Sequence, residues 1–371
     1  MNTADSNDLA GALAPILRLG RWWLATRTDT QLAFLCSFLL LKNGLTLLAE
    51  NARIVYIPGA LNLPNPPGYL TTSIGNMALA RVTGAFSVNE WMVLHEILVL
   101  LVICLGALLA SRQTYLPQPV LMLVLFTSTA FSTLSTTIGI YDPVTLLGAL
   151  SFTLARSRVL IFLGAGIMAL GNAEQAVLAS LSLFLLSTIP QFSDWRLRAS
   201  IGAATSVLVL LTLQVWMHSS RASTCFPGCT RFEALEEYLP LSLSNFFVAP
   251  TYAIWSWYGV SWFIVSCLLA VSIKRHRVLL ALSLIAIPGI ATLSTADGAR
   301  VFGLITFPSI VAASVWFWAK LQNSPNQLHL GIGILLILWI AIPSNGGRSG
   351  QLGEHIAEWI ASIFATVLSV P

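Results

Sequence analysis

Long apolar runs, separated by short gaps that hold almost all of the charges, make up most of this chain. In the hydrocarbon core of a membrane every backbone polar group must be paired within the protein, so such runs predict transmembrane helices. The pattern predicts about eleven spans, and a last apolar stretch, 355–370, is either a twelfth span or a helix on the membrane surface. The predicted spans are 31–49, 91–110, 120–139, 143–155, 159–171, 175–190, 200–217, 251–273, 278–294, 302–319 and 328–343.

Three of these runs, 143–155, 159–171 and 175–190, are shorter than the ~20 residues that cross ~30 Å of hydrocarbon. Short paired spans in a polytopic protein often line a cavity instead of facing lipid. The predicted fold class is therefore an all-α polytopic membrane protein, with residues 1–371 forming a single transmembrane domain and no separate soluble domain.

The few charges are sorted between alternate gaps. Charged residues make up 9% of the chain, and the mean hydropathy is +0.80. If the N-terminus is cytoplasmic, twelve basic residues lie inside and six outside, which satisfies the positive-inside rule. The inner set is Arg18, Arg21, Arg27, Arg112, Arg156, Arg158, Arg196, Arg198, Lys274, Arg275, Arg277 and Lys320, and the outer set is Arg53, Arg81, Arg221, Arg231, Arg300 and Arg348. The net charge of +4 then reflects topology and gives no indication of nucleic-acid binding.

Acidic residues gather on the predicted outer side, where two gaps, 50–90 and 218–250, are long. The acids there are Glu50, Asp142, Glu174, Glu233, Glu236, Glu237 and Asp297. The N-terminus shows no signal-peptide cleavage pattern. We therefore expect a multi-pass membrane protein with a cytoplasmic N-terminus and its polar chemistry on the non-cytoplasmic face.

Cysteine usage agrees with an oxidising outer side. Cys225 and Cys229 flank a Pro-Gly turn in the long outer gap 218–250, a spacing that allows a disulfide. Zinc binding by these two cysteines is the weaker interpretation, because no second Cys or His pair is nearby. The remaining cysteines lie in spans as small apolar residues.

The outer gap 50–90 contains a predicted interfacial helix. The prolines of 64–67 stop any helix before it, apolar residues recur at helical spacing from Leu70, and Gly84 suits the helix end. Arg81 lies on the apolar side of this helix, where it either snorkels to lipid headgroups or contacts a lipid phosphate.

An ordered set of elements in residues 31–190 resembles the GT-C glycosyltransferases. The set is the Pro-Pro-aromatic element that ends at Tyr69, the interfacial helix ending in Gly, a span opening Asn89-Glu90-Trp91, Asp142-Pro143 opening a short span, a basic turn at Arg156-Ser157-Arg158, and an outer turn at Gly171-Asn172-Ala173-Glu174. The second half matches only in span count and sidedness.

The resemblance implies an enzyme that takes a sugar from a polyprenyl-phosphate carrier and transfers it, with inversion, to a glycan, lipid or protein acceptor on the outer side. It implies an acid just after the first span, the position of Glu50, and basic residues at the departing phosphate. The sequence has Glu at this position where the family more often has Asp, and it lacks a second acid nearby, so the base and any divalent metal stay undecided. The resemblance also places Tyr69 among the residues that contact the substrate.

Each candidate residue has a structural alternative. Glu50 is either the catalytic carboxylate or a cap at the membrane boundary, Asp142 is a second catalytic acid or a helix cap, and Glu174 contacts substrate or lies in a solvated turn. Asp297 and Arg300, three residues apart, form a local salt bridge or hold a lipid phosphate.

Among the basic residues, Arg300 is the first candidate for the phosphate contact and Arg53 the second. Lys42, within the first span, either snorkels outward or faces the active cavity. The neighbouring His95 and Glu96, in the second span, either satisfy each other or face that cavity, and we favour the structural alternative.

Motifs of other enzyme classes are missing from the sequence. It contains no Gly-rich phosphate loop with Lys-Ser/Thr, no His-Glu-x-x-His and no Gly-x-Ser-x-Gly. Two alternatives to a GT-C enzyme stay open: a polymerase or ligase of lipid-linked glycans, which lacks the interfacial helix, and a lipid or solute transporter, which predicts inverted repeats and charges near mid-membrane.

Overall fold

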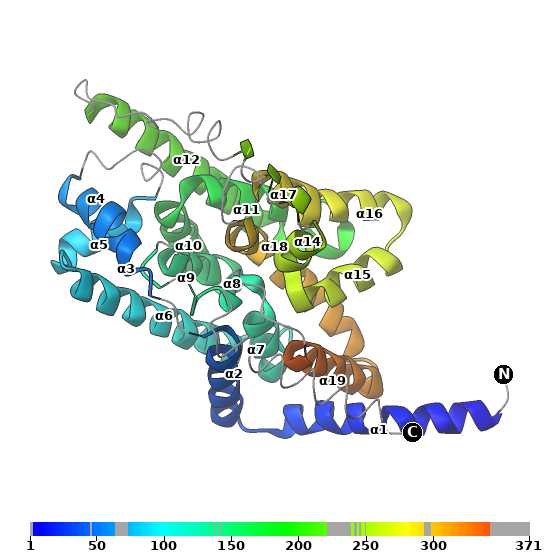
Figure 1. Cartoon of the computed structure of the whole chain (residues 1–371). Coiled ribbons are helices and arrows are strands. Elements are labelled where there is room, and N and C mark those ends of the chain that lie inside the picture. The colour runs from blue at the N-terminus through cyan, green and yellow to red at the C-terminus, as the bar shows by residue number, and fades with distance from the viewer. Residues whose placement is uncertain are drawn as a thin grey trace.

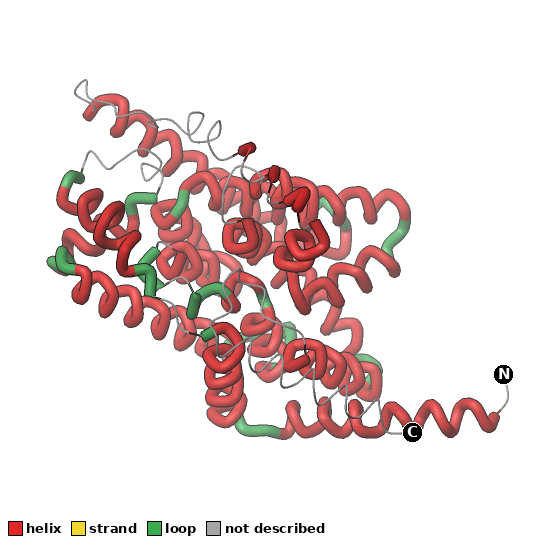
Figure 2. The backbone as a smooth tube through the Cα atoms, viewed as in Figure 1, coloured by secondary structure: helices red, strands yellow, loops and turns green. Residues whose placement is uncertain are grey.

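The computed structural model describes residues 3–44, 47–63, 73–136, 138–140, 142–220, 239–240, 243–244, 246–248, 250–292 and 298–341. Every named element in these ranges is helical, as the apolar runs predict (Figure 1). Short loops join most neighbouring helices (Figure 2). Several predictions concern residues outside the described ranges: the Cys225–Cys229 disulfide, the roles of Tyr69 and Asp297, and the stretch 355–370.

Helices α9 (Asp142–Leu154), α10 (Arg158–Gly171), α11 (Ala173–Ser187) and α12 (Arg196–Ser220) form one side of the bundle, and their starts fall within four residues of those predicted. α6 (Val88–Ser111) begins with a capping box: the Ser87 Oγ accepts from the Glu90 backbone N–H, and a Glu90 carboxylate oxygen accepts from the Ser87 N–H.

α18 (Gly298–Leu321) is the central helix. Its most apolar stretch is 89% buried inside the protein, against 33% for α6, and it contacts α9, α11 and several other helices. The residues buried in α18 begin at Val301, and the three before it are partly buried.

Three of the predicted spans are interrupted within the apolar run, and a fourth, 31–49, ends early because its helix stops at Asn43, before Gly44 (φ 72°). The run 120–139 divides at Ser128, whose extended backbone separates α7 (Gln118–Thr127) from α8 (Thr129–Ser132). The run 251–273 consists of α14 (Pro250–Tyr258), a 3-10 turn η4 (Gly259–Ser261) and α15 (Trp262–Val271). The run 278–294 passes from α16 (Lys274–Ala281) through a π-helical segment, η5 (Leu282–Ala286), to α17 (Ile287–Thr292).

The breaks are stable because side chains from one broken helix bond the backbone of another. The Thr129 Oγ1 donates to the Trp257 carbonyl (2.8 Å), the Ser261 Oγ to the Thr127 carbonyl (3.4 Å) and the Tyr258 hydroxyl to the Leu284 carbonyl (2.6 Å). Irregular backbone at membrane depth requires such partners, since lipid offers none.

The predicted interfacial helix is present as α5 (Gly75–Thr83), and it ends at Gly84 in the left-handed conformation (φ 76°) as the sequence indicates. Before it, α3 (Ala49–Asn51), the π-helical η1 (Ala52–Tyr56) and α4 (Ile57–Leu61) form one short helical stretch. A second core of buried apolar side chains lies under these helices, centred on Met77 and Trp91.

The N-terminal helix α1 (Thr3–Ala25) was not among the predicted spans. It lies beside α19 (Pro325–Ala341) and extends beyond the rest of the molecule (Figure 1). A sharp corner joins it to α2 (Thr28–Asn43), held by the Gln31 Nε2 donating to the Trp23 carbonyl (2.6 Å).

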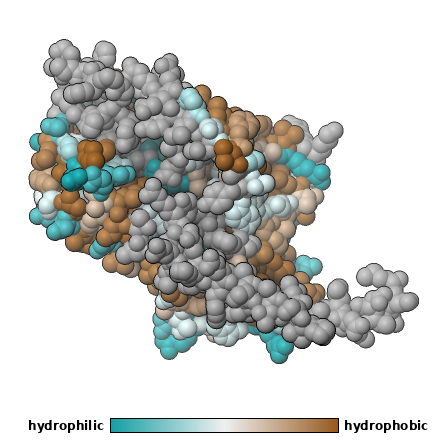
Figure 3. Space-filling model, in the orientation of Figure 1, coloured by the Kyte–Doolittle hydropathy of each residue, from teal (hydrophilic) through white to brown (hydrophobic). Residues whose placement is uncertain are grey.

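Among the described residues, four helical stretches are long and apolar enough to cross a membrane, and several shorter apolar helices accompany them. The four are Val88–Ser111, Pro190–Trp216, Ala253–Val271 and Gly298–Leu321. Large apolar side chains on α10 and α12, such as Phe162 and Leu208, are exposed, and broad hydrophobic areas cover the coloured parts of the face in Figure 3. The described part of the chain is therefore all-helical, with four candidate membrane-spanning helices, as expected for a helical membrane protein.

The helix ends separate into two groups, which we name after the two ends of α9. At the Asp142 end, the start of α6 meets residues 138–140, because the Trp91 Nε1 donates to the Gly139 carbonyl (2.8 Å). At the Leu154 end, Arg198 at the start of α12 donates to the Thr153 carbonyl (2.7 Å). The described gaps predicted to be cytoplasmic and those predicted to be outer thus gather at opposite ends of α9.

Candidate functional site

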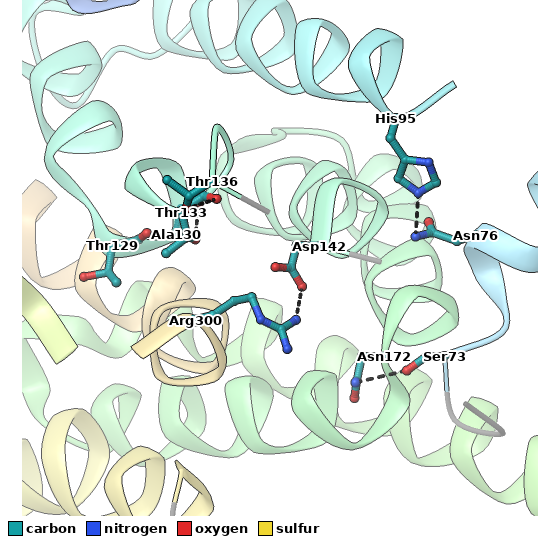
Figure 4. Close-up of polar contacts among 10 residues, drawn as sticks. All are labelled: Ser73, Asn76, His95, Thr129, Ala130, Thr133, Thr136, Asp142, Asn172 and Arg300. Atoms are coloured by element: carbon teal, nitrogen blue, oxygen red, sulfur yellow. Dashed lines mark hydrogen bonds and ion pairs between the residues drawn. The ribbon is translucent and has the colours of Figure 1, made fainter. Parts of the chain in front are cut away.

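A buried ion pair lies at the Asp142 end. The Arg300 Nη1 donates to the Asp142 Oδ1 at 2.7 Å, and the two side chains are 11% and 3% exposed. Asp142 is the first residue of α9 and Arg300 the third of α18, so the contact joins positions 158 residues apart in the chain. Figure 4 shows the two side chains pointing toward each other between two groups of polar residues.

Hydroxyl groups of the broken helix α7–α8 lie on one side of the pair (Figure 4). Ser128, Thr129, Ser132, Thr133 and Thr136 are all buried. The hydroxyls of Ser128, Thr129, Thr133 and Thr136 donate to backbone carbonyls, as in the Thr136 Oγ1 donating to the Thr133 carbonyl (3.1 Å), and these bonds keep the turn in place beside the pair.

Two amide side chains lie on the other side (Figure 4). The Asn172 Nδ2 donates to the Ser73 Oγ (3.1 Å), and its Oδ1 caps α11 by accepting from the Gln175 N–H (3.0 Å). Asn76, on α5, bonds the His95 ring at 3.1 Å, and its Oδ1 is buried without a hydrogen-bond partner. A buried unpaired acceptor beside a polar site is a place where a ligand N–H or O–H can bind.

His95 is held as a structural residue, the alternative that the sequence analysis favours. The Trp91 carbonyl lies 2.8 Å from the His95 Nδ1 and can only accept, so Nδ1 carries the proton. The Nε2 is then the acceptor for the Asn76 amide. Both ring nitrogens are therefore engaged, and its partner is Asn76 instead of Glu96.

Glu50 and Arg53 pair with each other instead of joining the buried pair. Their side chains are 63% and 67% exposed, and the Arg53 Nη2 lies 2.6 Å from the Glu50 Oε1. Glu50 was assigned to the acceptor and Arg53 to the phosphate, but the two side chains contact each other across one helical turn.

Arg81 bonds backbone instead of projecting freely from α5. Its Nη1 donates to three carbonyls at the end of α4, of which Leu63 is nearest at 2.9 Å and Leu61 next at 3.4 Å. A guanidinium at the C-terminal end of a helix satisfies carbonyls that lack helical partners. This contact joins α4 to α5.

Lys42 is buried near the end of α2. Its Nζ donates to the Trp339 carbonyl and lies 5.9 Å from the centroid of the Trp339 ring. Asn43, the next residue, donates to the Ser132 carbonyl in α8 (2.7 Å). Lys42 therefore packs against α19 in the protein interior instead of snorkelling outward, and its contacts with Trp339 do not place it in an active cavity.

No protein-family model matches the chain, and neither a curated protein nor a solved structure matches it. The function must therefore be inferred from the site itself.

Glu174 is half-buried in the first turn of α11, two residues after the Asn172 cap. Within the described ranges, no three His, Cys, Asp or Glu side chains come together to hold a metal ion. The structure thus brings Asp142 and Arg300 together, places Asn172 and Glu174 nearby in the chain fold, and keeps Glu50 and Arg53 on the surface.

Several polar residues beside the pair were missed from the sequence. The run 127–137, Thr-Ser-Thr-Ala-Phe-Ser-Thr-Leu-Ser-Thr-Thr, lies inside a predicted span. Ser and Thr are tolerated in membrane helices, so the run passed as part of an ordinary span. Its density of hydroxyls was the signal that could have indicated a broken helix.

Proposed function

We propose that this protein is a membrane glycosyltransferase, which transfers a sugar from a polyprenyl-phosphate carrier to an acceptor hydroxyl with inversion. The Asp142–Arg300 pair carries the proposal, because it places a carboxylate and a guanidinium 2.7 Å apart, buried, at one end of the bundle. A transfer of this kind needs a carboxylate near the acceptor and a cation at the departing phosphate.

Arg300 is the proposed phosphate contact. A guanidinium presents five N–H groups in a planar fork, enough to hold a carboxylate and a phosphate oxygen at once. As the bond from the anomeric carbon to the phosphate oxygen breaks, its electron pair stays with the phosphate, and the guanidinium stabilises the added negative charge. Buried surroundings make this interaction stronger than it would be in water.

Asp142 is the proposed base. The acceptor hydroxyl attacks the anomeric carbon from the face opposite the phosphate, and its proton passes to the Asp142 carboxylate. As Arg300 turns its charge toward the leaving phosphate, the carboxylate loses part of its stabilising partner and accepts a proton more readily. The Asn76 amide oxygen and the side chains around Asn172 are proposed to bind sugar hydroxyls.

Residues at the rim are given supporting roles. Glu50 and Arg53, exposed on α3 and η1, are proposed to orient the acceptor or the lipid headgroup at the entrance, and Arg81 holds α5 against α4. Lys42, held by the Trp339 carbonyl, contributes positive charge to the same end of the bundle.

In the proposed orientation the Asp142 end faces the periplasm. The gaps at the Leu154 end carry most of the basic residues, including Arg112, Arg158 and Arg198, and the positive-inside rule assigns such an end to the cytoplasm. The protein is thus proposed to lie in a bacterial inner membrane, with lipid-linked sugar reaching the site from the outer leaflet.

The test is transfer by purified protein in lipid vesicles, supplied with a panel of radiolabelled polyprenyl-phosphate monosaccharides and membrane-extracted acceptors. The wild type is expected to consume one donor. Asp142→Asn keeps the size of the side chain and Arg300→Lys keeps the positive charge, but both are expected to slow transfer by about 100-fold or more. The matched controls Glu50→Gln and Arg53→Lys, on the exposed pair, are expected to slow it by less than about tenfold.

Two results would overturn these assignments. Loss of transfer in Glu50→Gln with near-normal transfer in Asp142→Asn would move the base to Glu50. Consumption of no monosaccharide donor by folded protein would refute the transferase, and turnover of lipid-linked oligosaccharides instead would indicate a polymerase or ligase.

The broken helices favour a second candidate function, a lipid or solute transporter. Discontinuous helices that meet inside the membrane often form transporter binding sites, and α7–α8 meets α14–η4 through the Thr129 and Ser261 hydrogen bonds. One observation weighs against this candidate. Thr129 and Ser261, at the meeting point, are buried and their hydroxyls are bonded to protein, which favours a structural role. Movement of a labelled lipid-linked sugar across vesicles without its cleavage would support the transporter.

A further inference from the structure

A cavity lies at the Leu154 end, at the opposite end of α9 from the Asp142–Arg300 pair. It has a volume of about 200 Å³, and its walls come from the gap after α6, the end of α9, the turn before α12 and the end of α18. Because these four segments are the ends of apolar helices, the cavity lies where the helical bundle meets the membrane surface.

Two opposite charges line this cavity without pairing to each other. The Arg198 guanidinium donates through Nη1 to the carbonyls of Phe152 (2.8 Å) and Thr153 (2.7 Å) and lies 5.4 Å from the Trp195 ring. Asp194 is exposed, and within the described part of the chain its carboxylate takes part in no ion pair. A ligand that carries both signs of charge could satisfy both.

The floor of the cavity holds an unused hydroxyl. Thr153 is 1% exposed, and its Oγ1 is buried without a hydrogen-bond partner. The Nε and Nη2 of Arg198 likewise make no hydrogen bond with any described residue. A phosphate oxygen accepts hydrogen bonds from both a hydroxyl and a guanidinium, and charge-assisted bonds of this kind are the strong ones.

The remaining lining has the character of a membrane interface. Tyr115, Trp195 and Trp316 contribute aromatic surface, and Leu116 and Leu121 contribute buried apolar surface. Tyr and Trp are enriched where membrane meets water. The lining thus combines buried apolar side chains, the buried Thr153 beside the half-buried Arg198, and the exposed Asp194.

We propose that this cavity binds a phospholipid whose headgroup carries a primary ammonium, with its phosphate at Arg198 and Thr153 and its ammonium at Asp194. Such a lipid carries an acyl chain, a phosphate and an ammonium, and the lining offers a partner of matching chemistry to each of the three. The site is separate from the transfer reaction and does not depend on it. In the proposed orientation it takes its lipid from the cytoplasmic leaflet.

The experiment is native mass spectrometry of delipidated protein, titrated with phosphatidylethanolamine, phosphatidylcholine or phosphatidylglycerol of identical acyl chains. The ethanolamine lipid is expected to bind about tenfold more tightly than the choline lipid, whose quaternary ammonium cannot donate a hydrogen bond to Asp194. The glycerol lipid, which has no ammonium, is expected to bind more weakly than the ethanolamine lipid.

Three variants make the test specific. Asp194→Asn is expected to abolish the preference for ethanolamine over choline, and Asp29→Asn, which changes an exposed acid at the same end, is expected to keep it. Thr153→Val removes the buried hydroxyl at nearly constant shape, so we expect weaker binding of all three lipids with the preference unchanged. Arg198 is left intact because it caps α9.

Equal affinities for the ethanolamine and choline lipids would overturn the proposal, as would a preference that survives Asp194→Asn. The last measurement is a competition with water-soluble phosphoethanolamine. If it displaces the lipid completely at comparable concentration, the cavity takes a soluble zwitterion and the lipid assignment is wrong. If it fails to compete, the apolar part of the cavity contributes and the lipid is the ligand.

Discussion

Replacing Arg300 with alanine is expected to lower the free energy of unfolding by about 3–5 kcal/mol, the usual range when one partner of a buried ion pair is removed. The Asp142 side chain is 3% exposed, so its carboxylate would lose its guanidinium without gaining water. Asp142→Ala is expected to be destabilising to a similar degree, because it leaves the Arg300 charge inside the protein.

The measurement is reversible unfolding in mixed detergent micelles, and the double variant Asp142→Ala with Arg300→Ala completes a double-mutant cycle. Removing both charges with apolar residues of similar volume, Asp142→Leu with Arg300→Met, is expected to recover most of the loss, since no unpaired charge is left behind. The exposed pair is the control: Glu50→Ala and Arg53→Ala are expected to change stability by less than about 1 kcal/mol.

Strict additivity of the Asp142 and Arg300 losses would contradict an energetic pair at this position. Activity separates the two roles that we assign to Arg300. Arg300→Lys keeps the positive charge, and the lysine ammonium can still approach Asp142, so we expect a smaller stability loss than for Arg300→Ala. Transfer is nevertheless expected to fall, because an ammonium cannot replace the planar fork of a guanidinium at a phosphate.

The start and type of the regular helices could be predicted from the sequence because local physics decides them. Asp142-Pro143 opens α9 within one residue of the predicted span, and Gly84 ends α5 where a left-handed residue is needed. Ser87 and Glu90 form a capping box that is also visible in the sequence. Each of these signals depends on residues a few positions apart.

The site could be predicted only in part, because its central contact is not local. Sequence spacing offered Asp297, three residues away, as a local partner of Arg300, and Asp297 lies outside the described residues. The described partner, Asp142, lies in another helix, 158 residues away, where spacing gives no signal. The reverse holds for Glu50 and Arg53, which spacing alone could have paired and which were assigned to separate roles.

Apolar patterning also could not show where a span breaks. Ser128 and Gly259 interrupt long apolar runs, and the breaks are stable because hydroxyls from distant residues bond the backbone carbonyls. α1 was missed for a different reason. It carries Arg18 and Arg21 and is not a candidate span, so hydropathy gave no signal for a helix that lies beside α19.

Replacing either of two glycines on α10, two positions apart, with alanine is expected to change the stability of the protein, in opposite directions for the two sites. A Cβ at Gly164 would meet α9 backbone and side chain at once: the Phe152 nitrogen, the Ser151 Cβ at 2.8 Å and the Gly148 carbonyl oxygen at 2.9 Å. A Cβ at Gly166 would meet nothing within 4 Å. The α9–α10 contact thus depends on one of these glycines and not on the other.

Gly164→Ala is expected to destabilise the protein by about 1–3 kcal/mol, since α9 or α10 must shift to admit the methyl group. Gly166→Ala is expected to stabilise it by up to about 1 kcal/mol, because alanine is the better helix former and meets open space. Unfolding of both variants in the same micelles measures the difference, and equal effects would contradict the close approach of the two helices.

The same comparison tests how the site is built. Asp142 is the first residue of α9, and α9 is held against α10 by backbone contact at Gly164 and against α18, which carries Arg300. A displacement of α9 moves the carboxylate relative to the guanidinium, so Gly164→Ala is expected to reduce transfer even where the protein stays folded, by about 100-fold for a shift near 1 Å. Gly166→Ala leaves α9 in place and is expected to keep full transfer. Normal transfer in folded Gly164→Ala would show that the position of α9 does not set the geometry of the reacting groups.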